Sequence, residues 1–183
     1  GYDPAEDSAG QPSQNTQGRG IYFVNARTGE LVWHVRGGAD PGDPRIRQIK
    51  GMTHSMPGDL AIVDLNGDKV ADRMYGADTR SRIWRFEIND NASSAEDLVT
   101  PETKPFATLQ LKSADDDEDA VSLGEQRRIY NRIVPTFAIS PDGEPFLALT
   151  VGTGHRARPL APILDEPETG TPLPQKDIVE DRF

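Results

Sequence analysis

Short apolar and β-branched runs, separated by turn-forming residues, recur along the chain and predict β-strands. Hairpins are expected where a Gly-bearing turn such as Ala26–Gly29 or Ser140–Glu144 joins two runs. In the run 82–88 the apolar alternation fails at Trp84, as expected for a strand that packs on both faces. The predicted strands span 20–25, 31–35, 59–63, 73–78, 82–88, 106–111, 133–139 and 146–151, with shorter elements at 46–49 and 177–183.

A weak internal repeat organises these strands. Tyr22 and Asn25 precede Trp33 much as Tyr75 and Asp78 precede Trp84. A period of roughly 40 to 50 residues with several short strands per unit is typical of β-propeller blades. We therefore predict an all-β fold, a partial β-propeller of about two to three incomplete blades with long loops, in which the two tryptophans pack within blades.

The whole of 1–183 is interpreted as a fragment of one propeller domain. Its predicted parts are a partial blade at 20–55, a blade at 56–112, an acidic insertion at 113–128 and a partial blade at 130–183. So few blades cannot close a ring, so the remaining blades, and any targeting signal, are expected outside this sequence.

The composition agrees with a loop-rich β-protein and argues against several kinds of partner and site. The chain has 17 Gly and 15 Pro, 35% hydrophobic residues and a mean hydropathy of −0.61. Its net charge of −10 would repel phosphate backbones, and no basic patch is evident, so nucleic acid is not expected as a partner. It has no cysteine, which excludes disulfides and thiolate metal sites, and no apolar stretch reaches the length of a membrane span.

The chemistry of the chain is concentrated in one acidic loop between two predicted strands. Four oxygen-bearing side chains occupy its positions 1, 3, 5 and 9, and Val70 at position 7 would offer its backbone carbonyl. Calcium takes six to eight oxygen ligands, and alternate residues of a tightly curled loop supply them. The loop therefore predicts a Ca²⁺ site; its ligands would be Asp64, Asn66, Asp68, Val70 and Asp72.

One position of the loop departs from the usual pattern. Position 6, where such loops turn sharply on Gly, holds Lys69, which predicts a strained backbone and a positive charge near the site. The alternative interpretation is a solvated acidic turn stabilised by Asp and Asn side-chain hydrogen bonds.

No other motif predicts catalysis or cofactor binding. His34, His54 and His155 lack close ligand spacing and are expected to be structural or exposed. The run Asp115–Asp119 is interpreted as a solvated, mobile insertion, and Gly152–Arg156 as a turn at the end of a strand, because no P-loop lysine or helix pattern follows. Neither a nucleophile elbow nor a serine–histidine–acid set is apparent, so the prediction is a protein that is not an enzyme.

The order of motifs carries a family resemblance over nearly the whole chain. The motifs are Gly1–Asp3, Gly18–Tyr22, Thr28–Trp33, Ser55–Asp59, the run Val63–Thr79 closing on Ile83–Phe86, Leu147–Arg156 and Asp181–Phe183. In this order they resemble the C-terminal propeller of the PilY/PilC family of type IV pilus tip proteins. The most specific part is the acidic loop that runs into the Tyr-x-x-Asp and Trp-Arg-Phe hairpin.

The resemblance implies a modified, quinoprotein-like propeller in a large exported protein of a Gram-negative bacterium. Such a protein would pass through the periplasm to the outer membrane, cell surface or pilus tip. It would help minor pilins of the pilus tip complex prime the fibre, oppose retraction and attach to a host or abiotic surface. The resemblance also implies that calcium at the loop controls extension and retraction, a role that Lys69 leaves open.

Two other functions stay open. The motif Thr28–Trp33 also suits the repeats of a PQQ-dependent quinoprotein dehydrogenase, although nothing identifies an acid and tryptophan set around a quinone. The other is an extracellular, calcium-stabilised binding scaffold.

Overall fold

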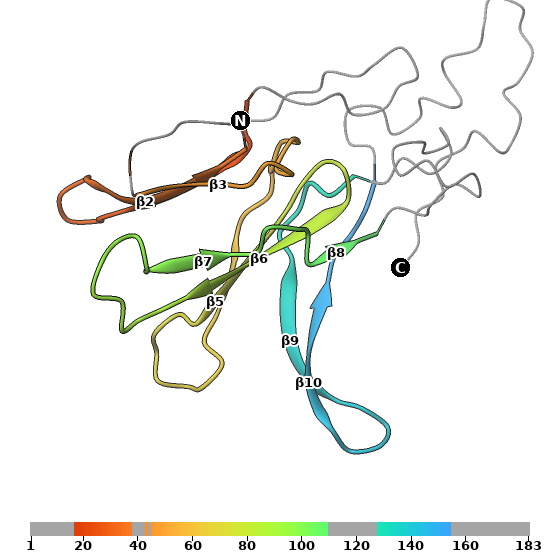
Figure 1. Cartoon of the computed structure of the whole chain (residues 1–183). Coiled ribbons are helices and arrows are strands. Elements are labelled where there is room, and N and C mark those ends of the chain that lie inside the picture. Colours follow the sequence, from red (N-terminus) through yellow and green to blue (C-terminus); the bar gives the residue numbers. More distant parts are fainter. Residues whose placement is uncertain (1–16, 38–42, 44, 110–127, 155–183) are drawn as a thin grey trace, which may run out of the picture.

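Strands are the only extended regular elements of this chain in the part that the computed structural model describes. That part comprises residues 17–37, 43, 45–109 and 128–154 (Figure 1). None of its residues form a helix long and apolar enough to cross a membrane. The predicted all-β class is confirmed, and the sheets are open, as expected for part of a propeller. Residues 113–127 of the insertion predicted at 113–128, His155 and the predicted strand at 177–183 lie outside the described residues.

The first sheet has the order β1-β2-β3 and contains the first predicted hairpin. Strand β1 (Gly20–Val24) pairs antiparallel with β2 (Leu31–Arg36), and β3 (Ile46–Gln48) lies parallel to β2. Asn25 closes the hairpin by accepting hydrogen bonds from the backbone N–H groups of Arg27 and Thr28, while Gly29 takes a φ of 79°.

The second sheet is the centre of the fold and has the order β4-β5-β6-β7, with β8 also paired to β6. Its strands are β4 (Ala61–Val63), β5 (Arg73–Ala77), β6 (Arg82–Ile88), β7 (Val99–Pro101) and β8 (Ala107–Thr108). Strand β7 lies between the predicted strands 82–88 and 106–111, where no strand was predicted, so that part of the prediction is wrong. It pairs at Ile88↔Val99 and buries Val99, although its sequence is too short to show alternation.

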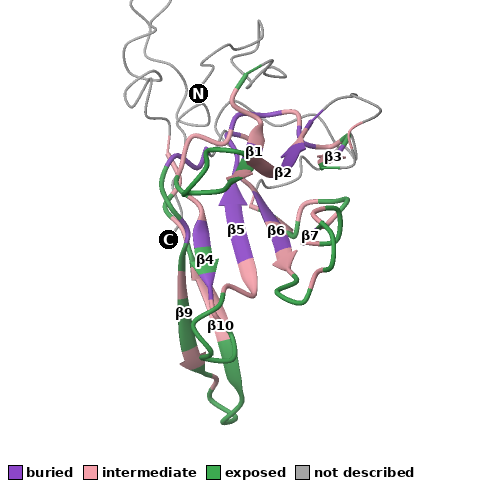
Figure 2. Ribbon diagram, turned by 90° about the vertical axis from the view of Figure 1, so that its left-hand side faces the viewer, coloured by how far each residue is buried: buried purple, intermediate pink, exposed green. Residues whose placement is uncertain are grey.

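The third unit is the hairpin of β9 (Val134–Ile139) and β10 (Pro145–Thr150), which confirms the hairpin predicted at the turn Ser140–Glu144. It extends away from the other sheets (Figure 1), and Figure 2 shows its far end as exposed. Phe137 and Ile139 are 63% and 74% exposed, whereas Leu147 and Leu149 pack against the core near the base of the hairpin.

The core consists of two clusters, one on each face of the second sheet. Trp84 and Phe86 of β6 enter a cluster with Trp33 and Val35 of the first sheet. Ile83, the neighbour of Trp84, enters the other cluster, with Ile129 and Ile133 beside the third unit. Because successive side chains of a strand point to opposite faces, β6 is buried on both sides. This confirms the explanation given for the broken alternation at Trp84.

Candidate metal centre

The acidic loop connects β4 to β5, the position predicted from the sequence. The two strands pair up to Val63↔Arg73, and the N–H of Asp72 donates to the carbonyl of Val63 at 3.0 Å. The nine residues from Asp64 to Asp72 therefore form the closed end of a hairpin, largely exposed to solvent.

The acidic side chains of the loop accept hydrogen bonds from its own backbone. Asp64 accepts from the N–H groups of Gly67 (2.6 Å) and Lys69 (2.8 Å), one at each carboxylate oxygen. Asp72 accepts from the N–H of Leu65 at 2.6 Å, which joins the two ends of the loop. These bonds curl the loop around its acidic residues.

The middle of the loop repeats the same pattern on a shorter scale. Asn66 accepts from the N–H of Asp68 at 2.8 Å, and Asp68 accepts from the N–H of Val70 at 2.7 Å. The side-chain amide of Asn66 also donates to the carboxylate of Asp68 at 3.0 Å. Asn and Asp side chains favour such turns because they can replace a backbone acceptor two residues away.

Two residues of the loop lie in the left-handed region of backbone conformation. Gly67 has a φ of 83°, which costs glycine little, and Lys69 has a φ of 73°, which is unfavourable for a residue with a Cβ. The strained backbone predicted at loop position 6 is therefore present. Its N–H points at Asp64, so the strain is offset in part by a charge-assisted hydrogen bond.

The electrostatics of the loop favour ionised acids. The N–H groups of Lys69 and Gly67 hold the pKa of Asp64 below its ordinary value of 3.8. The carboxylate is thus negative at neutral pH, the form that a cation requires.

The residues fit calcium in donor type and in register. Three carboxylates and one amide oxygen are hard donors, and a carboxylate oxygen that accepts one hydrogen bond keeps a further lone pair. In the described residues, however, no three His, Cys, Asp or Glu side chains are gathered closely enough to form a metal cluster. The ligand set Asp64, Asn66, Asp68, Val70 and Asp72 stays a prediction, and so does Ca²⁺.

A buried polar network lies behind the next turn and was not predicted. Asp78 is fully buried and accepts hydrogen bonds from the Nε of Arg82 (2.8 Å) and the Nε1 of Trp84 (2.9 Å). Arg82 also contacts the carbonyl of Gly51 at 2.9 Å and the Nδ1 of His54 at 3.1 Å. The only sequence signal for this network was the internal repeat, in which Asp78 occupies the position of Asn25. The partners Gly51 and His54 are remote from Arg82 in sequence.

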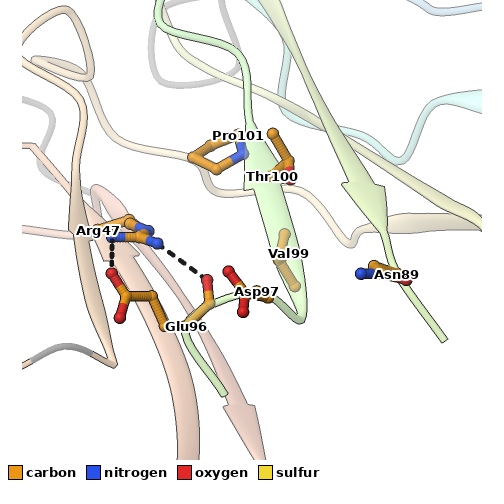
Figure 3. Close-up of a pocket in the computed structure, with 7 residues that line it drawn as sticks. All are labelled: Arg47, Asn89, Glu96, Asp97, Val99, Thr100 and Pro101. Carbon is orange, nitrogen blue, oxygen red and sulfur yellow. Dashed lines mark hydrogen bonds and ion pairs between the residues drawn. The ribbon is translucent and has the colours of Figure 1, made fainter. Parts of the chain in front are cut away.

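Two cavities lined by described residues are further candidate sites. One, of about 270 Å³, lies between β3 and the segment that leads into β7 (Figure 3). Arg47 faces Glu96 across it, with a 3.1 Å ion pair and a 3.0 Å hydrogen bond to the carbonyl of Glu96. Its cationic side chain is already paired, which indicates a structural link between two sheets. The other cavity, at the start of β1, is considered below.

Comparison with known proteins supplies a relative for this chain. No family model matches it. It is 35% identical over 85 residues to the type IV pilus biogenesis factor PilY1 homolog of Xylella fastidiosa (strain Temecula1 / ATCC 700964). The match covers 44% of the chain and only 5% of that relative, so the chain spans a small part of such a protein.

Among solved structures, the chain is similar to the crystal structure of the Pseudomonas aeruginosa PilY1 C-terminal domain. The two share 19% identity with a TM-score of 0.43, over 74% of this chain and 26% of the other. The sequence match confirms the predicted resemblance, and the chain is identified as similar to part of a PilY/PilC-family type IV pilus protein.

Proposed function

We propose that this chain is a calcium-binding β-propeller segment of a type IV pilus biogenesis factor. The observation that carries the proposal is the 35% identity to the PilY1 homolog. Pilus assembly, control of retraction and surface attachment are the activities proposed for the protein that contains the segment. Minor pilins of the tip complex are the proposed partners, and the outer membrane, cell surface or pilus tip the proposed location.

Within this proposal the loop between β4 and β5 is the calcium site. Asp64, Asn66, Asp68 and Asp72 would supply side-chain oxygens and Val70 its carbonyl. Bound calcium would draw these groups together, neutralise the acids and stiffen the loop. Asp72 lies next to β5, and its carbonyl accepts a hydrogen bond from the N–H of Ile88 at 2.7 Å. A change in the loop would therefore reach β6 of the central sheet through Asp72.

Calorimetry tests the calcium site directly. Wild-type protein should give a saturable binding heat on calcium addition, and Asp64→Ala/Asp68→Ala should give none. The control Asp90→Ala removes an exposed acid from another loop and should bind as wild type does. Calcium at about 100 times its Kd should also stabilise the folded protein by about 2.7 kcal/mol, because only the folded loop binds it. Equal heats in the wild type and the double variant would refute the site.

Lys69→Gly sharpens the same experiment. Glycine accepts the φ of 73° without strain and removes a positive charge, so this variant should bind calcium more tightly than wild type. Lys104→Gly removes an exposed lysine outside the loop and should leave calcium binding unchanged. Weaker calcium binding by Lys69→Gly would contradict the assignment of position 6.

The biological role needs a separate test. In a bacterium that carries the gene, its deletion should abolish surface pili and twitching motility, and the wild-type gene should restore both. Normal piliation in the deletion strain would refute the pilus role. Reduction of a dye after addition of the quinone and calcium would instead support the dehydrogenase alternative.

A further inference from the structure

One cavity of the described residues lies where β1 begins and β2 ends, away from the acidic loop. Its volume is about 450 Å³, within the range of pockets that hold small ligands. Three glycines, Gly18, Gly20 and Gly37, form part of its wall, so the backbone itself is open to a ligand there. The remaining lining residues are Gln17, Arg19, Tyr22, Arg36 and Met56.

The charge of this cavity is opposite to that of the chain. Both of its charged lining residues are arginines, although the chain carries a net charge of −10. Arg36 has a further interaction within the chain, so the argument rests on Arg19, whose guanidinium makes no ion pair with any described residue. The other cavity differs, because its Arg47 is paired with Glu96. A half-buried guanidinium at a cavity wall is suited to a carboxylate or a phosphate.

One wall of the cavity is an exposed aromatic ring. Tyr22 is 61% exposed and stacks on the buried ring of His34, with centroids 3.9 Å apart and an interplanar angle of 14°. The stack supports one face of the Tyr22 ring. A flat, supported aromatic ring beside a guanidinium can pack against the apolar face of a ring-shaped ligand while the guanidinium holds its acid group.

The cavity wall beside the Tyr22 ring is formed by Gly20, which has no side chain. A Cβ on Gly20 would lie 3.1 Å from the Nε2 of His34 and 3.5 Å from the Tyr22 ring, so a side chain there would crowd both. The Nε2 has no hydrogen-bond partner, and burial together with the charge of Arg36 lowers the pKa of His34. A negative charge in the cavity would oppose the effect of Arg36 and raise that pKa again.

We propose that this cavity binds a small carboxylate-bearing sugar of the uronic acid class. The carboxylate pairs with Arg19, with Arg36 beside it, and one face of the sugar ring lies on Tyr22. The site is independent of calcium and of the acidic loop.

The test is an NMR titration of the full chain with glucuronate as the probe, and with glucose and inorganic phosphate as comparisons. Glucuronate should shift the signals of Tyr22 and His34 and raise the pKa of His34. Glucose lacks the charge and phosphate lacks the ring, so each should bind at least about tenfold more weakly, a loss comparable to one charge-assisted hydrogen bond.

Variants separate the two contacts. Arg19→Gln and Tyr22→Leu should each weaken glucuronate binding by about tenfold. Arg27→Gln removes an exposed arginine on the turn at the other end of the β1–β2 hairpin and should bind as wild type does. The proposal is overturned if glucuronate causes no shift, if phosphate binds as tightly as glucuronate, or if Arg19→Gln behaves like Arg27→Gln.

Discussion

Asp78→Ala should be among the most destabilising substitutions in the described part of this chain. Asp78 is fully buried, and both its carboxylate oxygens are in use. One oxygen accepts from the backbone N–H groups of Arg80 (2.9 Å) and Arg82 (3.2 Å). The other accepts from the Arg82 side chain and from the Nε1 of Trp84 at 2.9 Å. Alanine would remove every one of these acceptors at once.

The magnitude follows from what the substitution leaves behind. The side chain of Arg82 is 13% exposed, so its charge would lose its partner in a poorly solvated place. Removing one member of a buried ion pair typically costs about 3–5 kcal/mol. For a domain of this size about 1 kcal/mol corresponds to roughly 2–4 °C in Tm, so a decrease of about 10 °C is expected. Asp78→Asn keeps an acceptor for Trp84 and should lose less.

Thermal unfolding followed by circular dichroism measures this effect. Asp43→Ala is the matched control, because Asp43 also pairs with an arginine, Arg45, at 2.6 Å, but in an exposed place. Solvent screens an exposed pair, so the Tm of that variant should hardly change. Equal decreases in Tm for Asp78→Ala and Asp43→Ala would refute the conclusion that burial makes the Asp78 network important.

Two further predictions follow from the backbone and from the acidic loop. Gly37→Ala should destabilise the fold by about 1–3 kcal/mol, because its Cβ would lie 1.7 Å from the carbonyl oxygen of Met52. Gly152 has open space around it, so Gly152→Ala should leave the free energy of unfolding unchanged. Chemical denaturation measures the free energy of unfolding of both variants. The pKa of Asp64 is lowered below 3.8, so its ionised form stabilises the folded loop above that pH, and this contribution is lost as the pH falls through the lower folded-state value. The amide NMR signals of Gly67 and Lys69 should therefore titrate with a midpoint below about pH 3.8, and Asp64→Asn should lose this transition. A midpoint above that pH would contradict the hydrogen bonds to Asp64.

The hairpins could be predicted because their signals are local. Apolar runs and the turn residues that join them lie within a few positions of each other, as at Asn25, Gly29 and Gly143, and the two turn glycines take the positive φ that the turns require. Trp84 illustrates the same point for burial. Its broken alternation indicated packing on both faces, and β6 is indeed covered on both.

The elements that escaped prediction depend on partners remote in sequence. Strand β7 is held by its pairing with β6. Its three residues are too few to show alternation, and Pro101 is unfavourable in a strand. The contacts of Arg82 with Gly51 and His54 cross 31 and 28 positions of sequence. The cavity at β1 likewise needs Met56 beside Gly20. No spacing rule brings such residues together, so only the fold reveals them.

The acidic loop and the Asp78 turn are held by the same kind of hydrogen bond, but one is exposed and the other is buried. In both, an aspartate accepts backbone N–H groups and a residue other than glycine takes a positive φ, Lys69 in one and Ser81 in the other. At Asp78 the remaining acceptor capacity is taken by Arg82 and Trp84 inside the core, so the turn is fixed and no cation could replace those donors without leaving Arg82 unpaired. At Asp64 the partners are exposed N–H groups only, and no arginine of the described residues pairs with the loop. The acids of the loop therefore keep lone pairs facing solvent, and this difference in burial is the physical reason to look for calcium at Asp64 and for stability at Asp78.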